Sequence, residues 1–334
     1  MGFDTLLGNE QLKQNLTAAR DRDRFSHFYL ICGPEGSGRH TLADLLAAAM
    51  LCTGADAPCG VCPSCRKVLS HSHPDYVTVD DPEKATVPVE LIRQARADVF
   101  VRPNEGRRKI YLFPRAQDMG IPGQNALLKV LEEPPEYGAF LLLTDNPNKL
   151  LPTVRSRCEV LALSPVTVQE AESFLAARYP DRTPAEIAHA AARCEGILGR
   201  AVDQLEGKAG DGKALEGAAT LLKRLCDRDE LAILDFCAGL ERDKWDRDAI
   251  GALLDEFLLL TRDCLVCAAG ALHESDPRRR ALAEQGAEAL SPKVLTGAAA
   301  LAEQLRTACG FYVGAGHIAG WLGAGLARIF LSQE

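Results

Sequence analysis

The sequence GPEGSGRHT, residues 33–41, has the spacing of a phosphate-binding loop without its two characteristic side chains. Such loops follow the pattern of Gly, four residues, Gly, Lys and then Ser or Thr. Gly33 and Gly38 stand in the two glycine positions. Arg39 replaces the lysine that contacts the phosphates, and His40 replaces the hydroxyl residue that binds Mg²⁺. The sequence therefore keeps the loop and replaces the residues that make it catalytic.

The residues on either side of this loop indicate a strand and a helix. Residues 28–32, FYLIC, form a short apolar run that ends at the loop, and residues 41–52, TLADLLAAAMLC, have a strongly helical composition. Strand, Gly-rich turn and helix, with Gly36 inside the turn, is the context that a phosphate-binding loop requires. We therefore interpret this region as part of an α/β domain rather than as a chance Gly-rich turn.

Further apolar runs alternate with helical patterns along the first half of the chain. The predicted strands cover residues 75–80, 109–114, 139–145 and 158–163, and the helical patterns between them cover residues 88–100 and 121–133. Strands that alternate with helices form a mostly parallel sheet with helices on both faces. The sequence therefore predicts an α/β fold over residues 1–165.

Pro165 marks a change to purely helical patterns. Helices are predicted at residues 167–178, 184–195 and 199–206, and a last helical region at 214–334 follows a Gly-containing link at 206–213. A chain of this length usually contains more than one domain. We predict three domains, which cover residues 1–165, 166–206 and 207–334.

The composition indicates a soluble globular protein with an acidic charge balance. The 334 residues are 47% hydrophobic and 25% charged, and the net charge is −8. A protein that binds nucleic acid on its own usually has a basic surface, because its affinity comes largely from neutralising phosphates. The acidic balance therefore argues against an autonomous nucleic-acid-binding protein.

The sequence predicts neither export nor membrane insertion. Residues 1–16 contain no apolar signal core, so we expect a cytoplasmic protein whose twelve cysteines are reduced thiols or metal ligands. Residues 308–327 contain no Asp, Glu, Lys or Arg, but they include six glycines and no long aliphatic run. We expect this segment to form a buried helix rather than a membrane span.

The sequence CTGADAPCGVCPSC, residues 52–65, predicts a metal site. Its spacing is C-x6-C-x2-C-x2-C, and the four cysteines are Cys52, Cys59, Cys62 and Cys65. Four thiolates this close can surround one ion tetrahedrally, as in structural zinc sites, and they leave no open coordination position for catalysis. An Fe–S cluster and metal-free cysteines are the alternatives. His71 and His73 follow closely, but a complete sulfur shell does not need them.

A second feature of ATP hydrolysis is also missing. An ATPase needs an acidic residue at the end of a second strand. Here the run KIYLF, residues 109–113, is followed by PRAQ, residues 114–117, which contains no carboxylate. Thr41 has a hydroxyl but lies one residue late, which turns it about 100° away on a helix. Losses at two separate places predict that this chain does not hydrolyse ATP; a variant ATPase that uses Asp118 is the alternative.

Two strings of the sequence are highly specific. They are GQNALLKVLEEPP, residues 123–135, and LLLTDNPNKLLPTVRSRC, residues 141–158. With them, the four cysteines and the degenerate loop, the chain resembles the AAA+ clamp-loader subunits of bacterial DNA polymerase III, in particular those of the delta-prime type. The resemblance covers residues 1–206 by motifs and residues 207–334 by helical character alone. It implies an AAA+ P-loop domain with a zinc-module insertion at residues 52–65, a small helical lid domain and an all-helical collar domain for oligomerisation.

The resemblance also implies roles for individual residues. Ser156, Arg157 and Cys158 match the Ser-Arg-Cys motif, whose arginine reaches as a finger into the ATP site of the neighbouring subunit. A guanidinium delivered in this way stabilises charge on the transferred phosphoryl group. Thr144 matches the family's sensor-1 position and Arg200 its sensor-2 position. A solvated helix arginine is the alternative for Arg200.

By the same resemblance, the chain is a non-hydrolysing, stator-like subunit of a hetero-pentamer with gamma/tau and delta subunits, in which the neighbours bind ATP. The sliding clamp and primed DNA are then partners of the whole complex. An ATP-hydrolysing gamma/tau-type subunit, or another AAA+ ATPase, is the alternative function. A zinc-dependent nucleic-acid-binding module is a third hypothesis, which the acidic net charge opposes.

Overall fold

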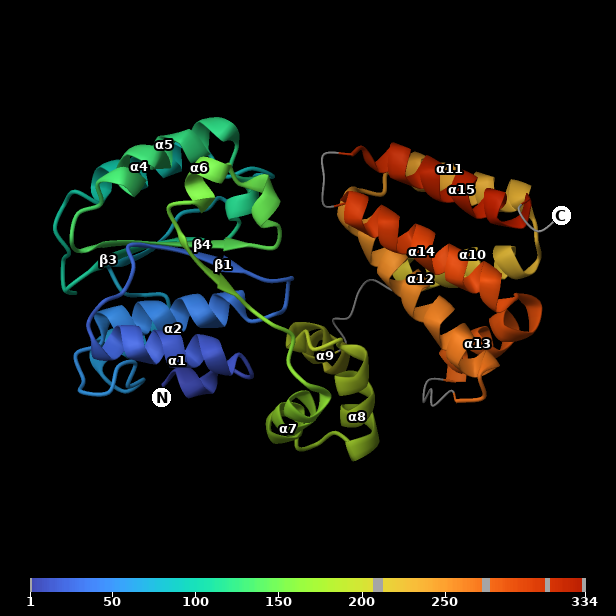
Figure 1. Cartoon of the computed structure of the whole chain (residues 1–334), viewed down its shortest axis with the longest axis horizontal. Coiled ribbons are helices and arrows are strands. Elements are labelled where there is room, and N and C mark those ends of the chain that lie inside the picture. The colour runs from blue at the N-terminus through green and yellow to red at the C-terminus, as the bar shows by residue number, and fades with distance from the viewer. Residues whose placement is uncertain (1, 207–212, 272–276, 310–312, 332–334) are drawn as a thin grey trace. The chain divides into compact units, whose positions relative to one another are not determined.

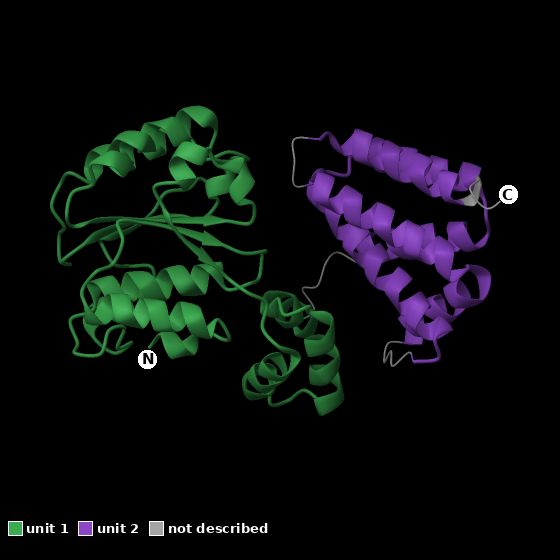
Figure 2. Cartoon of the chain, in the orientation of Figure 1, with its two compact units in different colours: residues 1–207 green, residues 208–334 purple. Residues whose placement is uncertain are grey.

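The computed structural model describes residues 2–206, 213–271, 277–309 and 313–331. The chain forms two compact units, Met1–Gly207 and Lys208–Glu334 (Figure 2). The first unit contains the sheet, its covering helices and a small group of three helices. In the described part of the second unit, helices are the only regular secondary structure.

The first unit is built on a five-stranded parallel sheet with the strand order β2-β3-β4-β1-β5. The strands are β1 (Phe28–Cys32), β2 (Tyr76–Thr78), β3 (Lys109–Phe113), β4 (Gly138–Thr144) and β5 (Glu159–Ala162). Each neighbouring pair runs parallel, so the carboxyl ends of all five strands lie at one edge of the sheet. The predicted mostly parallel α/β fold is confirmed.

Helices cover both faces of this sheet (Figure 1). The helical segments are η1 (Phe3–Thr5), α1 (Glu10–Asp21), α2 (Arg39–Leu51), α3 (Pro63–Leu69), α4 (Val89–Asp98), η2 (Ala116–Asp118), α5 (Ile121–Glu132), η3 (Pro147–Lys149) and α6 (Pro152–Arg155). In β1, Tyr29 and Ile31 pack in the core with α1 and α2, whereas Phe28 and Leu30 pack in the core with α4 and α5. A strand covered on both faces has no solvent-facing position, which explains why its sequence is continuously apolar.

A buried carboxylate fastens a loop to the start of β2. Asp75 is 0% exposed, and its two carboxylate oxygens accept hydrogen bonds from the backbone N–H groups of Asn104, Glu105 and Gly106 at 2.6, 2.8 and 2.7 Å. Burial by itself raises the pKa of the Asp75 carboxyl, but these donors outweigh burial and hold the pKa below its ordinary value of 3.8. The ionised form is therefore the one that stabilises the fold.

Asp75→Asn is expected to lower the free energy of unfolding by about 3 kcal/mol near neutral pH. In asparagine an NH₂ group replaces one carboxylate oxygen, and this group would face backbone N–H donors from which it cannot accept a hydrogen bond. The stabilisation by Asp75 is complete above its ordinary pKa and is lost as the pH falls through the lowered pKa of the folded state. Urea unfolding of the wild-type chain and of Asp75→Asn, at neutral pH and at about pH 3, measures this loss of stability. An unchanged difference between the chains at the acidic pH would contradict the assignment.

Three short helices follow the sheet within the first unit. They are α7 (Val168–Arg178), α8 (Pro184–Arg193) and α9 (Leu198–Leu205). Thr167 and Glu170 form a capping box at the start of α7, and Thr183 and Glu186 form another at the start of α8. These helices share a small core of their own, and the predicted domain boundary at residue 165 stays a prediction.

The second unit contains the helices α10 (Lys213–Cys226), α11 (Glu230–Arg242), α12 (Arg247–Ala268), α13 (Pro277–Ala289), α14 (Pro292–Cys309) and α15 (Ala315–Leu331). Their apolar faces meet in one core that contains Phe257 and Leu260 of α12. Across the described residues, none of the helices combines the length and the apolar character needed to span a membrane.

The buried helix expected over residues 308–327 is confirmed in that α15 packs into the helical core, but its bounds and its burial on all sides were wrong. α14 ends and α15 begins inside this segment, and residues 310–312 lie outside the described part of the chain. In α15, Ile318 and Leu322 are buried, but Trp321 is 46% exposed. Apolar side chains four residues apart bury only one face of a helix, so the absence of charge did not mean burial on all sides.

Candidate functional site

The Gly-rich loop lies where the sequence predicted it, between the carboxyl end of β1 and the first turn of α2. The N–H of Gly33 donates to the carbonyl oxygen of Thr144 at 3.2 Å, which places the loop beside the end of β4. Gly36 and Gly38 have φ angles of 81° and 92°, which only glycine adopts without strain. The Thr144 side chain is buried, and its hydroxyl accepts a hydrogen bond from the N–H of Asn146 at 3.1 Å.

The two replaced residues of the loop do not restore its chemistry. Arg39 is the first residue of α2, and its buried Nη1 makes no hydrogen bond to any of the described residues. Burial lowers the pKa of the Arg39 guanidinium, and the carboxylates of Asp145 and Glu35 oppose this effect. His40 is exposed at the next position and offers an imidazole instead of the hydroxyl that would hold Mg²⁺.

An arginine occupies the end of β3, where an ATPase needs a carboxylate. Arg115 binds Asp80 through two hydrogen bonds, from Nε to Oδ2 at 3.1 Å and from Nη2 to Oδ1 at 2.7 Å. Asp118, the alternative Mg²⁺ ligand from the sequence, lies 3.7 Å from Nη1 of Arg115. Both acidic groups therefore face a fixed positive charge, and sequence reasoning missed the pair with Asp80.

The small helical group of α7, α8 and α9 contacts the Gly-rich loop very closely at one point. The N–H of Gly199 donates to the carbonyl oxygen of Gly36 at 2.9 Å. A Cβ atom at residue 199 would lie 2.4 Å from the Cα of Gly36, so no larger side chain fits there. Arg200, the predicted sensor-2 residue, directs Nη1 to Glu195 of its own helical group at 2.9 Å.

The Ser-Arg-Cys segment follows α6 and leads into β5. The Arg157 side chain is 37% exposed, and its Nη1 and Nη2 donate to Thr153 O and Glu132 Oε1, both at 3.0 Å. Ser156 Oγ donates to Thr153 O at 3.3 Å. Burial raises the pKa of the Cys158 thiol to about 12, so this cysteine is a neutral packing residue. Arg157 is therefore the member of the motif that offers charge at the surface.

The structure does not bring Arg157 to the Gly-rich loop. β5 runs parallel to β1 and begins with Glu159 opposite Tyr29, so Arg157 lies near the amino ends of these strands. The Gly-rich loop leaves β1 after Cys32, at the carboxyl end. The predicted finger and the Gly-rich loop of this chain therefore lie toward opposite edges of the sheet.

A buried glutamine fixes the segment that carries Arg157. Gln124 of α5 is 2% exposed, and its amide nitrogen donates to Met119 O at 2.9 Å and Lys149 O at 3.2 Å. Its amide oxygen accepts from the N–H of Leu151 at 2.7 Å, directly before α6. The sequence predicted a helix over residues 121–133 but gave no role to the side chain of Gln124.

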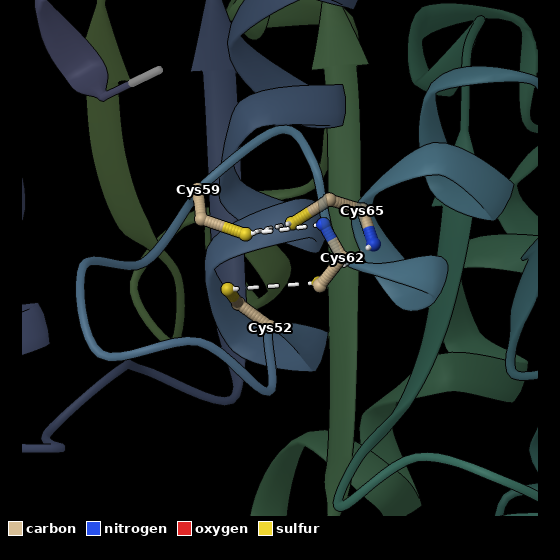
Figure 3. Close-up of side chains that lie close together, drawn as sticks. All are labelled: Cys52, Cys59, Cys62 and Cys65. Carbon is tan, nitrogen blue, oxygen red and sulfur yellow. Dashed lines mark hydrogen bonds between the residues drawn. The ribbon is translucent and has the colours of Figure 1, made fainter.

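The four predicted metal ligands come together at the end of α2 and the start of α3 (Figure 3). All four Sγ atoms lie within 4.8 Å of one another, with 3.9 Å between Cys52 and Cys62 and 4.0 Å between Cys59 and Cys65. A tetrahedron with Zn–S bonds of about 2.3 Å has sulfur atoms about 3.8 Å apart, which the observed distances match.

The surroundings of the cysteines also suit a metal-bound thiolate cluster. The N–H groups of Gly54, Cys62 and Cys65 point at sulfur atoms of Cys52, Cys59 and Cys62 at 3.3, 3.3 and 3.4 Å. The two nearby histidines do not join the group. His71 Nε2 lies 3.6 Å from Asp44 Oδ2, and His73 Nδ1 accepts from the N–H of Asp75. Within the described ranges, this is the one cluster of three or more Cys, His, Asp or Glu side chains close enough to hold a metal.

Comparison with known proteins adds family information to this geometry. Residues 8–167 match the protein-family model described as DNA polymerase III, delta subunit. The chain is 34% identical over 169 residues to the DNA polymerase III subunit tau of Bacillus subtilis, a match that covers 50% of this chain and 30% of that protein. It is 37% identical over 169 residues to the DNA polymerase III subunit delta′ of Pseudomonas aeruginosa, which covers 49% of this chain and 51% of that protein.

The matches differ in how much of each protein they include. The chain spans about half of the length of the delta′ relative and less than a third of the tau relative. Among solved structures, a gamma subunit-related DNA polymerase III protein from Thermotoga maritima aligns with 95% of this chain and 99% of its own, at 18% identity and a TM-score of 0.44.

Proposed function

We propose that this chain is a delta-prime-type subunit of a DNA polymerase III clamp loader, because residues 8–167 match the family model described as DNA polymerase III, delta subunit, and a delta′ subunit is among its similar proteins. In this role it does not hydrolyse ATP, and it supplies Arg157 as a finger to the ATP site of a neighbouring gamma/tau subunit. The proposal depends most on one observation, the separation of the exposed Arg157 from the degenerate loop of its own chain.

Two features support the proposal that the chain does not hydrolyse ATP, one in the Gly-rich loop and one at the end of β3. The loop has Arg39 and His40 in place of the lysine and the hydroxyl residue, and Arg115 stands at the end of β3. Phosphoryl transfer needs a metal ion held by a hydroxyl and a carboxylate. The guanidinium of Arg115, at the place where the carboxylate is needed, repels that ion. The same arrangement disfavours the ATP-hydrolysing gamma/tau-type alternative.

The finger role is supported by the exposure and the chemistry of Arg157. Its guanidinium lies at the surface, and bidentate recognition of phosphate oxygens is the contact that this group makes best. Since its own Gly-rich loop lies toward the other edge of the sheet, a phosphate on another subunit is the reachable target. Thr144 and Arg200 then keep the positions of nucleotide sensors without a nucleotide to sense.

The remaining parts of the chain fit an assembly role. The helical unit of residues 208–334 serves as the collar through which the chain joins gamma/tau and delta subunits in a cytoplasmic hetero-pentamer. The cysteine cluster holds a structural zinc ion that stabilises the first unit. The sliding clamp and primed DNA are bound by the complex, because this acidic chain lacks the charge to bind DNA alone.

The direct test mixes the purified chain with gamma/tau and delta subunits. We expect co-migration in size-exclusion chromatography and ATP hydrolysis that primed DNA stimulates only when the chain is present. The chain alone should show no Mg²⁺-dependent turnover. Turnover by the isolated chain that is lost in Arg39→Ala would establish the ATPase alternative, and salt-sensitive DNA binding by the chain alone would favour the nucleic-acid-binding module.

A further inference from the structure

Glu132, the last residue of α5, faces the guanidinium of Arg157. Its Oε1 accepts a hydrogen bond from Arg157 Nη2 at 3.0 Å, and the backbone carbonyl of Thr153 accepts from Nη1 at the same distance. The two acceptors lie on different helices, α5 and α6. Together they hold two nitrogen atoms of the guanidinium, in a side chain that is 37% exposed.

Both acceptors belong to one fixed frame. Gln124, eight positions earlier on α5, is buried and hydrogen-bonds Lys149 O and Leu151 N at the entry to α6. The relative position of the two helices is therefore set by buried bonds. An acceptor carried by such a frame restricts a long side chain to few rotamers, which lowers the entropy lost when the guanidinium later binds a phosphate.

The exposure of this ion pair limits its strength. Glu132 and Arg157 have side chains that are 56% and 37% exposed, so solvent screens their attraction. A phosphate group carries more charge and accepts bidentate hydrogen bonds from a guanidinium. The Glu132 carboxylate can therefore orient Arg157 and still release its guanidinium when that group binds the phosphate of a nucleotide.

We propose that Glu132 is a positioning residue for Arg157, which orients the guanidinium before it reaches the neighbouring ATP site. This inference rests on the proposed finger role of Arg157. Among the residues that the structure describes, none makes an ion pair or hydrogen bond with the side chain of the neighbouring Glu133, which provides the matched control. The interaction is specific to one of two adjacent carboxylates, which makes it testable by single substitutions.

The test measures DNA-stimulated ATP hydrolysis by the full reconstituted complex with Glu132→Ala, Arg157→Ala and the double variant. We expect Glu132→Ala to lower kcat about two- to fivefold with little change in KM, as expected for an exposed pair. In the Arg157→Ala background the same change should have no further effect. Glu132→Gln keeps an oxygen acceptor and should retain most of the rate, and Glu133→Ala should match the wild-type complex.

The outcomes separate this inference from the proposed function. If Arg157→Ala lowers the rate but Glu132→Ala does not, or if Glu132→Ala raises it, the positioning role is wrong and the finger role stands. If the two effects simply add in the double variant, Glu132 acts independently of Arg157 and the inference is also wrong. If Arg157→Ala leaves the rate unchanged, the proposed finger role itself fails.

Discussion

Arg157→Ala is expected to lower ATP hydrolysis at the neighbouring site of the assembled complex by about a thousandfold, since arginine fingers contribute factors of this size or more to phosphoryl transfer. The change should leave folding and assembly intact. The side chain is 37% exposed, and it donates hydrogen bonds to Thr153 and Glu132 of the same chain. Single-turnover hydrolysis by the reconstituted complex measures the effect, and size-exclusion chromatography checks assembly.

Two further variants define what the arginine contributes. Arg157→Lys keeps the charge but loses the planar fork, so it should recover only part of the rate. Arg155→Ala removes an arginine two positions away whose Nη1 donates to Asn148 Oδ1 at 3.1 Å inside the chain, and it should have little effect. A rate for Arg157→Ala equal to that of the wild type would refute the finger role. A loss of rate that accompanies loss of assembly would assign Arg157 to the interface instead.

The parts of this fold that the sequence predicted are those set by neighbouring residues. The strands could be located because a strand buried on both faces is apolar at every position, as Phe28 to Ile31 are. The cysteine cluster could be predicted because its four ligands lie within fourteen residues, between the end of α2 and the first turn of α3. In both cases the pattern and the structure it encodes occupy the same stretch of chain.

The contacts that the sequence did not predict join residues far apart in the chain. Asp75 bonds to a loop about thirty residues away, Arg115 after β3 pairs with Asp80 after the neighbouring strand β2, and Gly199 hydrogen-bonds to Gly36 of the Gly-rich loop. No local pattern distinguishes a glycine needed for close backbone contact from one in an ordinary turn. Such pairings depend on the order of strands in the sheet and on the placement of the lid helices, which periodicity does not specify.

The same distinction explains what was missed around Arg157. The Ser-Arg-Cys string marks the arginine, but nothing in the sequence connects it with Glu132, twenty-five residues earlier. Gln124 lies within the specific string of residues 123–135, where its side chain could not be separated from the packing residues around it. Its buried position and its three hydrogen bonds identify its role only in the folded chain.

Removing the proposed structural metal is the second change for which we expect a large effect. Cys65→Ser should abolish metal binding and lower the thermal midpoint of the first unit by about 10 °C, which corresponds to a loss of about 3 kcal/mol. Cys65 is 0% exposed and packs in the same core as Cys52 and α2. Serine offers a harder oxygen that binds zinc less well than a thiolate, so the four-sulfur shell cannot be completed. Metal analysis and thermal unfolding of the same preparations measure both effects.

Cys194→Ser provides the matched control, because Cys194 is 2% exposed in the core of the small helical group and lies outside the cysteine cluster. It should retain the metal and lose only the stability expected for one buried thiol, about 1 kcal/mol. A chelator should reproduce the effect of Cys65→Ser in the wild-type chain and have no further effect on that variant. Finding iron and sulfide in the purified chain would identify the site as an Fe–S cluster instead of a zinc site. Equal thermal midpoints for the chelated and untreated wild-type chains would mean that the cluster contributes nothing to folding, and the assignment of a structural metal would then be wrong.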